Sequence, residues 1–142
     1  MANVSLYLNF HGTTEAAFNF YRTVFGGEFG PLQRFRDTPG MEKLPEGDRG
    51  KIMHISLQIT QNMTLHGTDT LDTMGRSLNM GNNMSVMLEV NSKDEAQKYY
   101  NALAAGGRDE MPLQETFWGA YFGSFTDKFG VPWMIDFEQN PQ

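Results

Sequence analysis

The sequence contains no cysteine, so disulfide bonds, thiolate catalysis and cysteine-held metal sites are all excluded. A chain without disulfides is compatible with a reducing compartment. No apolar run approaches the roughly 18 residues that a membrane-spanning helix needs, and the N-terminus has no basic segment followed by an apolar one. We therefore expect a cytoplasmic protein.

Positive charge is also scarce, with 11 Lys and Arg against 17 Asp and Glu and a formal net charge of −6. Proteins that bind the nucleic-acid backbone or anionic membranes rely on a basic surface. We expect neither nucleic acid nor a membrane as a partner. The length of 142 residues favours a single domain, residues 1–142.

What the sequence does contain is a repeated pattern of strands and helices. Residues 3–10 alternate as a strand, and a stripe of apolar residues at helical spacing then ends at Gly26-Gly27. The same pattern returns 80 positions later, where a strand over residues 84–90 precedes a helix that ends at Gly106-Gly107. The helix starts are predicted at Gly12-Thr13 in the first case, and at a capping box over residues 92–95 in the second.

Later strands extend the repeat. Residues 51–60 and 63–68 resemble residues 117–126 and 131–137, with an offset of 66 that pairs His54 with Ala120 and an offset of 68 after the turns. A further strand is predicted over residues 28–36, and residues 37–50 are predicted to form a long loop. Each half is therefore β-α-β-β-β, with repeat 1 at about residues 3–69 and repeat 2 at about 84–138.

This duplication predicts an α+β fold in which two β-α-β-β-β repeats form curved mixed sheets with helices outside. In each strand one set of alternate positions is apolar and is expected to pack on the helices, Trp133 among them. The opposite face mixes aromatic, methionine and hydrogen-bonding groups, which is typical of a pocket for a small molecule. The predicted ligand-binding residues are Tyr7, Asn9, His54, Ser56, His66, Ser85, Met87, Trp118, Phe122 and Met134.

Several stretches also carry a family resemblance. They are Tyr7-Leu8-Asn9-Phe10, Phe25-Gly26-Gly27, Ile52-Met53-His54 and the run from Thr126 to Met134. Together they resemble the PhnB-like branch of the vicinal-oxygen-chelate (glyoxalase, bleomycin resistance, extradiol dioxygenase) superfamily. The resemblance covers nearly the whole chain and implies the glyoxalase/bleomycin resistance/dioxygenase fold.

Metalloenzymes of that superfamily place four ligands, usually His and Glu, on the concave face. The matching positions here are Ser5, His66, Ser85 and Met134, of which only His66 is a credible ligand for a divalent ion. We therefore predict no metal and no other cofactor. Glyoxalase-type isomerisation and ring-cleaving dioxygenation are in doubt for the same reason, because both polarise a chelated substrate through the metal.

Two functions remain open. The first is a metal-free protein that encloses a small, partly aromatic molecule, as the antibiotic-sequestering members of the superfamily do. The second is an enzyme of the lyase, isomerase or dioxygenase type, with His54 or His66 as the acid-base group or with an unusual metal site of His54, His66 and Glu89. His11 is expected to be a solvated or capping residue, and Glu89 and Asp136 are expected to be exposed at the cavity mouth.

Similar proteins are often named after ubiquinone-precursor methylation, and methyl transfer is not supported by this sequence. Transfer from S-adenosylmethionine usually needs a glycine-rich loop between a strand and a helix start, whereas both Gly-Gly pairs here lie at helix ends. The expected partners are a small-molecule ligand and a second copy of the chain. A homodimer is indicated by the superfamily resemblance and by residues 37–50, which have no counterpart in the second repeat.

Overall fold

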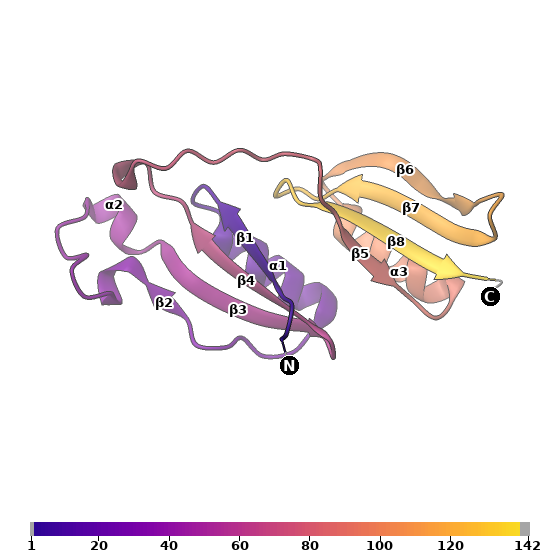
Figure 1. Ribbon diagram of the computed structural model, residues 1–142, viewed down its shortest axis with the longest axis horizontal. Coiled ribbons are helices and arrows are strands. Elements are labelled where there is room, and N and C mark those ends of the chain that lie inside the picture. Colours follow the sequence, from indigo (N-terminus) through magenta and orange to yellow (C-terminus); the bar gives the residue numbers. More distant parts are fainter. Residues whose placement is uncertain (1, 140–142) are drawn as a thin grey trace. The chain divides into compact units, whose positions relative to one another are not determined.

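The computed structural model describes residues 2–139, which divide into two compact units, one ending at Asn79 and the other beginning at Met80. Each unit contains a four-stranded mixed sheet and one long helix, and each is described by itself (Figure 1). Within residues 2–139, none of the helices combines the length and the apolar character needed to cross a bilayer.

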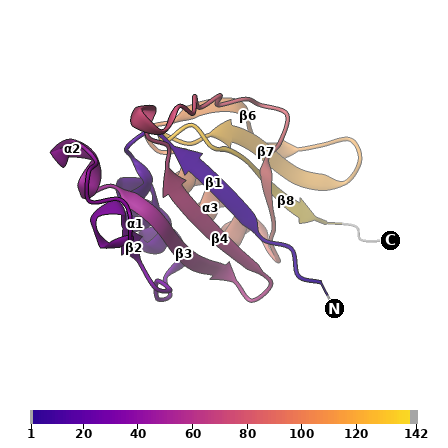
Figure 2. The ribbon, with the colours of Figure 1, turned by 60° about the vertical axis from the view of Figure 1, so that its left-hand side comes forward.

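The first unit has the strand order β1-β4-β3-β2, with β1 parallel to β4 and the other neighbours antiparallel. Figure 2 shows β1, β4 and β3 side by side. Three short helical segments also belong to this unit. The 3-10 turn η1 and the helical turn α2 lie between β2 and β3, and the 3-10 turn η2 follows β4. The bounds are β1 (Leu6–Phe10), α1 (Thr14–Phe25), β2 (Gln33–Arg34), η1 (Phe35–Asp37), α2 (Glu46–Arg49), β3 (Ile52–Thr60), β4 (Met63–Asp69) and η2 (Asp72–Met74).

The second unit has the equivalent order β5-β8-β7-β6, with β5 parallel to β8. Its elements are β5 (Val86–Glu89), α3 (Lys93–Ala104), β6 (Arg108–Glu115), β7 (Ala120–Thr126) and β8 (Pro132–Glu138). The predicted α+β fold of two β-α-β-β-β repeats is therefore confirmed.

The core of the first unit lies between its sheet and α1, which covers one face. Phe18 and Tyr21 are buried on the inner side of the helix, and their rings meet at 72° with centroids 5.8 Å apart. Gly67 of β4 lies directly beneath the Phe18 ring, where a Cβ atom would come within 2.4 Å of the ring. Position 67 must therefore lack a side chain, and the neighbouring side chain of His66 points to the opposite face of the sheet.

The core of the second unit is built the same way around α3. Trp133 is fully buried and donates a hydrogen bond from Nε1 to Oδ2 of Asp127 over 2.9 Å. Tyr100 of the helix packs edge-on against Phe125, and Gly123 leaves room for the Tyr100 ring. The predicted capping box is half formed: Oγ of Ser92 accepts the backbone N–H of Glu95 at 3.0 Å, whereas the Glu95 carboxylate accepts the N–H of Asn91 at 3.2 Å and not that of Ser92.

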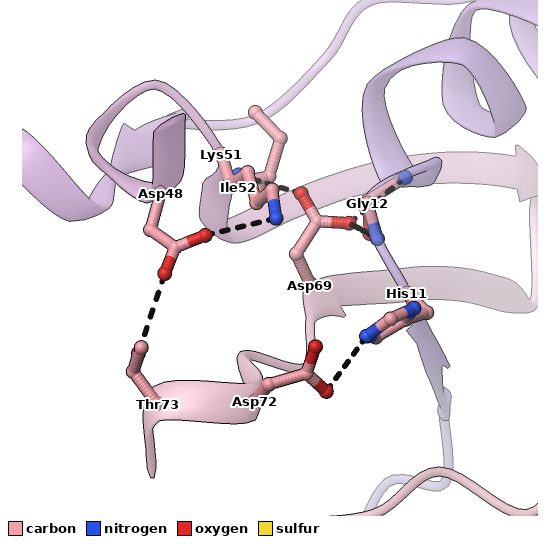
Figure 3. Close-up of polar contacts among 9 residues, drawn as sticks. His11, Gly12, Asp48, Lys51, Ile52, Asp69, Asp72 and Thr73 are labelled. Atoms are coloured by element: carbon pink, nitrogen blue, oxygen red, sulfur yellow. Dashed lines mark hydrogen bonds and ion pairs between the residues drawn. The ribbon is translucent and has the colours of Figure 1, made fainter. Parts of the chain in front are cut away.

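A buried carboxylate, Asp69 at the end of β4, holds the start of α1 (Figure 3). Its Oδ1 accepts the backbone N–H groups of Gly12 and Thr14 and the Thr14 hydroxyl, at 2.7–3.1 Å. Its Oδ2 accepts the N–H of Ile52 at 2.8 Å. The first N–H groups of a helix have no partner within the helix. Asp69 supplies an acceptor for them from strand β4 and so caps α1. The helix begins next to the predicted Gly12-Thr13, but the side chain of Thr13 does not cap it.

Around Asp69, three polar contacts connect the surrounding loops (Figure 3). The Lys51 ammonium donates to Asp48 at 2.9 Å, and the Thr73 hydroxyl donates to the other oxygen of Asp48 at 3.3 Å. His11 Nε2 lies 2.9 Å from Oδ1 of Asp72. This histidine is exposed and hydrogen-bonded at the corner between strand and helix, as predicted.

Three details of the sequence prediction are wrong. The strand expected over residues 28–36 is reduced to Gln33–Arg34 and a single bridge between Phe29 and Leu57, because β2 bulges against β3. The loop over residues 37–50 contains the helical turn α2. The strand expected from Phe117 begins at Ala120 instead.

The offset of 66 is also wrong. Ser56 pairs with His66 in the first sheet and Ser124 with Met134 in the second, so both later strands share the offset of 68. The predicted equivalence of His54 with Ala120 is therefore displaced by two residues, and His54 corresponds to Phe122.

Candidate functional site

The face of the first sheet that α1 does not cover carries the predicted ligand residues of this unit. We call it the first open face and define it by Tyr7, Asn9, Gln33, His54, Ser56, Gln58, Thr64, His66 and Thr68. Tyr7 of β1, His66 of β4 and Ser56 of β3 form one row across three adjacent strands. The alternation of each strand thus brings together side chains up to 59 positions apart in the sequence.

Two histidines form a hydrogen-bonded pair on this face. Nε2 of His54 lies 3.0 Å from Nδ1 of His66, and the two rings have centroids 5.2 Å apart. The Tyr7 ring is stacked on His66 at 5.8 Å and 8°, and lies tilted to His54 at 5.9 Å. Both histidines are partly buried, and 53% of Tyr7 is exposed. The Tyr7 and His66 rings thus form a nearly parallel, accessible stack, and the His54 ring is tilted by 32° to His66 and by 40° to Tyr7.

The hydrogen bond between the two rings determines where the N–H protons of the pair lie. When both rings are neutral they carry two N–H protons, and one of these occupies the hydrogen bond between Nε2 of His54 and Nδ1 of His66. The outer nitrogens are then one donor and one acceptor, and shifting both protons reverses their roles. The pair can therefore relay a proton, and a third proton makes both outer nitrogens donors.

Burial lowers the pKa of His54, and a charge on His66 would lower this pKa further. No carboxylate opposes this effect, since neither histidine makes an ion pair with any described residue. His54 therefore favours its neutral form, in which one of its ring nitrogens is a hydrogen-bond acceptor.

An open cleft with a volume of about 530 Å³ continues from His66 toward the turn between β3 and β4. This volume lies within the range of small-molecule sites. His66 belongs both to the stack with Tyr7 and to the cleft. The other residues that line the cleft are mainly amides and hydroxyls, with no Asp, Glu, Lys or Arg: Asn3, Val4, Ser5, Gln61, Asn62, Met63 and Thr64.

The second unit carries the other predicted ligand residues on the face that α3 leaves uncovered. We call it the second open face and define it by Met87, Glu89, Phe122, Ser124, Met134 and Asp136. Met87 pairs with Met134, and Glu89 pairs with Asp136. The ring of Trp118 meets that of Phe122 edge-on at 6.2 Å. This face combines soft apolar groups with carboxylates.

Two predicted positions differ from expectation here. Trp118 lies in the turn between β6 and β7, where the hydroxyl of Thr116 accepts the N–H of Ala120 and ends the strand ladder. Asp136 is 8% exposed, where exposure at a cavity mouth was expected. Burial raises the pKa of Asp136, and the hydrogen-bonded neighbour Glu138 raises this pKa further. Glu89 is exposed, as predicted.

The four superfamily metal positions are divided between the units. Ser5 and Ser85 are exposed residues just before β1 and β5, while His66 and Met134 lie on the two open faces. The histidines of the proposed unusual metal site are paired in the first unit, and Glu89 belongs to the second. Across residues 2–139, no three His, Asp or Glu side chains gather as a metal site would require. The missed residues are Gln33, which pairs with His54, and Thr68, which pairs with Asn9.

Comparison with known proteins agrees with this architecture. The family model for 3-demethylubiquinone-9 3-methyltransferase matches residues 2–136. Protein YjdN from Escherichia coli (strain K12) is 32% identical over 94% of this chain and 93% of its own. The crystal structure of protein PA1353 from Pseudomonas aeruginosa is 37% identical, with a TM-score of 0.85 over 99% of this chain and 100% of that one.

More distant structures share the fold. A putative 3-demethylubiquinone-9 3-methyltransferase, PhnB protein, from Bacillus cereus has a TM-score of 0.79 at 23% identity, over 96% of this chain and 99% of that one. A glyoxalase/bleomycin resistance protein/dioxygenase family enzyme from Burkholderia phytofirmans PsJN has a TM-score of 0.62 at 17% identity, over 96% and 99%. The chain belongs to the family described as 3-demethylubiquinone-9 3-methyltransferase, and it shares its fold with glyoxalase/bleomycin resistance/dioxygenase structures.

Proposed function

We propose that this protein binds a small planar molecule on the first open face, without a metal. The observation that carries the proposal is the stack of Tyr7 on His66 beside the hydrogen-bonded His54. A flat ligand would extend this stack, with hydrogen bonds from Ser56 in the same row and from Asn9 in a neighbouring row. Pockets of this kind combine aromatic surface with a few placed polar groups.

The second open face is a further candidate ligand surface. Met87 and Met134 are unbranched and polarizable, so they adapt to apolar ligands of different shapes. Trp118 and Phe122 add aromatic area, and Ser85 adds a hydroxyl at the strand start. We propose the first open face as the ligand site because its histidine pair would orient a ligand by hydrogen bonds.

An acid-base enzyme is the second candidate, and the contact between His54 and His66 favours it. A pair that relays a proton between two outer nitrogens can act as a general base and then as a general acid. The candidate reaction class is therefore proton transfer on a bound small molecule. Consumption of the bound ligand that stops in His54→Gln and His66→Gln would favour the enzyme over the binding protein.

The family description names a methyl transfer, which we do not propose for this chain. Methyl transfer from S-adenosylmethionine commonly uses a glycine-rich turn that opens a helix in a doubly wound sheet. Here Gly26 follows the last residue of α1 and Gly106-Gly107 follow α3, so both glycine pairs lie at helix ends. Both sheets are mixed and four-stranded.

We propose a homodimer as the assembly. Phe117 is 97% exposed beside Trp118, and Met84 and Met87 are exposed in the same unit. Two-fold dimers are the commonest soluble oligomers, and aromatic residues and methionine are enriched in interfaces. Light scattering at micromolar concentration should give twice the 16.1 kDa chain mass, and the mass of one chain would contradict the dimer.

Native mass spectrometry of the protein purified without chelator tests the binding proposal. We expect a co-purified or added small aromatic molecule to remain bound to the wild type and to be lost from His66→Gln. The His11→Gln variant is the matched control, because His11 lies at the exposed corner with Asp72. Retention of the ligand by His66→Gln would show that it binds elsewhere.

Elemental analysis of the same sample tests the metal-free part. We expect less than about one-tenth of an equivalent of transition metal per chain, since a divalent site usually needs three or four protein ligands. Nearly stoichiometric Ni, Zn, Fe or Mn would contradict the metal-free proposal.

A further inference from the structure

We propose that the pair of His54 and His66 selects a planar weak acid, such as a phenol or an enol, and receives the acidic proton of this ligand. The inference rests on the proposed binding function and adds the chemical class of the ligand. It follows from three features of the first open face: the absence of fixed charge, the free proton capacity of the imidazole pair, and the flat ring surface of Tyr7.

The first feature is the charge of the face. All of its nine defining positions are occupied by Tyr, Asn, Gln, His, Ser or Thr, and the adjoining cleft also lacks Asp, Glu, Lys and Arg. A cationic ligand would find no carboxylate, and a permanently ionised phosphate or sulfate would find no Arg or Lys. Burying an unpaired charge is costly, so neither ligand class fits.

The second feature is proton capacity. A neutral pair holds two protons on four nitrogens, and one outer nitrogen is a bare acceptor. When the ligand O–H transfers its proton to this nitrogen, the O–H bond breaks, an N–H bond forms and the site then holds an anion beside a singly charged pair. Net charge is conserved, and the cation that the face lacks is produced by the ligand's own proton.

The surroundings leave the pair as the proton acceptor. Tyr7 of β1 is the titratable neighbour of the pair, and Gln33 of β2 lies opposite His54. The Arg34 guanidinium is bound to the Glu15 carboxylate by two contacts, of 2.6 and 3.1 Å. The lowered pKa of His54 favours its neutral imidazole before the ligand arrives, and the anion left on the ligand then stabilises the protonated pair.

The third feature sets the shape of the ligand. The Tyr7 and His66 rings are nearly parallel, at 8°, and more than half of Tyr7 is exposed. A planar molecule beside this stack gains offset ring contacts, and its acidic group can reach the imidazole edge in the same plane. A phenol or cyclic enol has this combination of a flat ring and an in-plane O–H.

The probe for this inference is 4-nitrophenol, and 4-nitroanisole is its matched control. The two have the same ring, but the anisole has a methyl group in place of the acidic proton. Nitrophenolate absorbs at longer wavelength than neutral nitrophenol, so difference absorption reports directly where the proton is. Titrations are made below the ionisation midpoint of the free phenol, with wild type, His54→Gln, His66→Gln and His11→Gln.

We expect wild type and His11→Gln to bind nitrophenol with the spectrum of the anion, and to bind nitroanisole at least about tenfold more weakly. We expect His54→Gln and His66→Gln to lose this preference and to bind nitrophenol in its neutral form, because glutamine forms hydrogen bonds but does not take a proton. Far-ultraviolet circular dichroism confirms that each variant is folded.

Two results would overturn the inference in distinguishable ways. Equal affinity for the two probes, or a bound nitrophenol that stays neutral, would reject the weak acid and leave the binding function intact. Failure of the wild type to bind either probe at millimolar concentration would reject the binding of planar molecules, and the inference with it.

Discussion

The two units share one topology and differ on their open faces. Equivalent strand positions hold Tyr7 and Met87, His66 and Met134, His54 and Phe122, Asn9 and Glu89, and Thr68 and Asp136. The first face is uncharged and rich in hydrogen-bonding groups, whereas the second is apolar and acidic. Ser56 and Ser124 are the exception, since both faces have serine there. The two units therefore differ in side-chain chemistry on the faces that the helices leave uncovered.

The helix-facing positions show a different kind of variation. Each sheet has one glycine beneath an aromatic ring of its helix, Gly67 under Phe18 and Gly123 under Tyr100. These glycines occupy different strands, because Ile55 pairs with Gly67 in one sheet and Gly123 pairs with Ile135 in the other. Both cores thus have an aromatic ring packed closely on a glycine, but at different strand positions. Packing against the helices restricts the residues on these faces, whereas the open faces carry no such restriction.

The largest expected effect concerns Asp69, which organises the first unit and is replaced by Phe137 at the equivalent position. Asp69→Ala leaves the N–H groups of Gly12, Thr14 and Ile52 without their acceptor. We expect a loss of about 4–6 kcal/mol in the free energy of unfolding. Urea denaturation measures this loss. Asp72→Ala is the control, and an equally large loss there would show that any acidic deletion in this region is damaging.

The next effect separates the two faces of the second unit. Trp133 is fully buried against α3, and 53% of Trp118 is exposed. We expect Trp133→Ala to destabilise by about 3–5 kcal/mol, and Trp118→Ala by less than about 1 kcal/mol. Thermal and urea unfolding measure both. Equal, small losses would mean that the helix-facing and open faces have been exchanged.

A smaller effect compares equivalent positions on the two open faces. Tyr7→Leu removes the ring that stacks on His66, so we expect the affinity for nitrophenol to fall about threefold to tenfold. Met87→Leu changes the equivalent side chain of the second unit, and we expect less than about a twofold change. Fluorescence or absorption titration gives both values. The opposite order would move the ligand to the second face.

The smallest expected effect is the pH dependence of stability from His54. Its folded pKa lies below the unfolded value of about 6.5, so the unfolded chain binds more protons between the two values. Stability from this group is present above the unfolded value and is lost as pH falls through the folded value. Wild type should therefore lose more stability than His54→Gln between about pH 8 and about pH 5. A larger loss in the variant would contradict the direction of the shift.

The periodicity of the sequence was sufficient to predict the repeat and the division of each strand into two faces. Alternation in β3 and β4 placed His54 and His66 on one side, because strand side chains alternate whatever the partner. The contact between them could not be predicted, since it depends on the pairing register of two strands. Trp118 was predicted to lie in a strand, whereas it lies in the turn that follows Thr116. The sequence does not mark this turn, because aromatic residues occur both in the turn and in the strand after it.

The role of Asp69 was hidden for a related reason. Its four hydrogen bonds reach Gly12, Thr14 and Ile52, which are 57, 55 and 17 positions away in the sequence. A helix cap supplied by a distant strand leaves no local signal of the kind that Ser92 and Glu95 provide at α3. Aspartate after a strand and before a polar connector is also common in turns. Its burial is visible only once β4 pairs with β1 and β3.

The central claim is that the ligand lies on the first open face, and the two faces carry natural probes that decide it. Nuclear magnetic resonance of protein with labelled histidine imidazoles and labelled methionine methyl groups observes His54 and His66 on one face, and Met87 and Met134 on the other. Addition of 4-nitrophenol should shift the two imidazole signals and leave those two methyl signals in place. Shifts of the Met87 and Met134 methyl groups with unchanged His54 and His66 imidazoles would contradict the account.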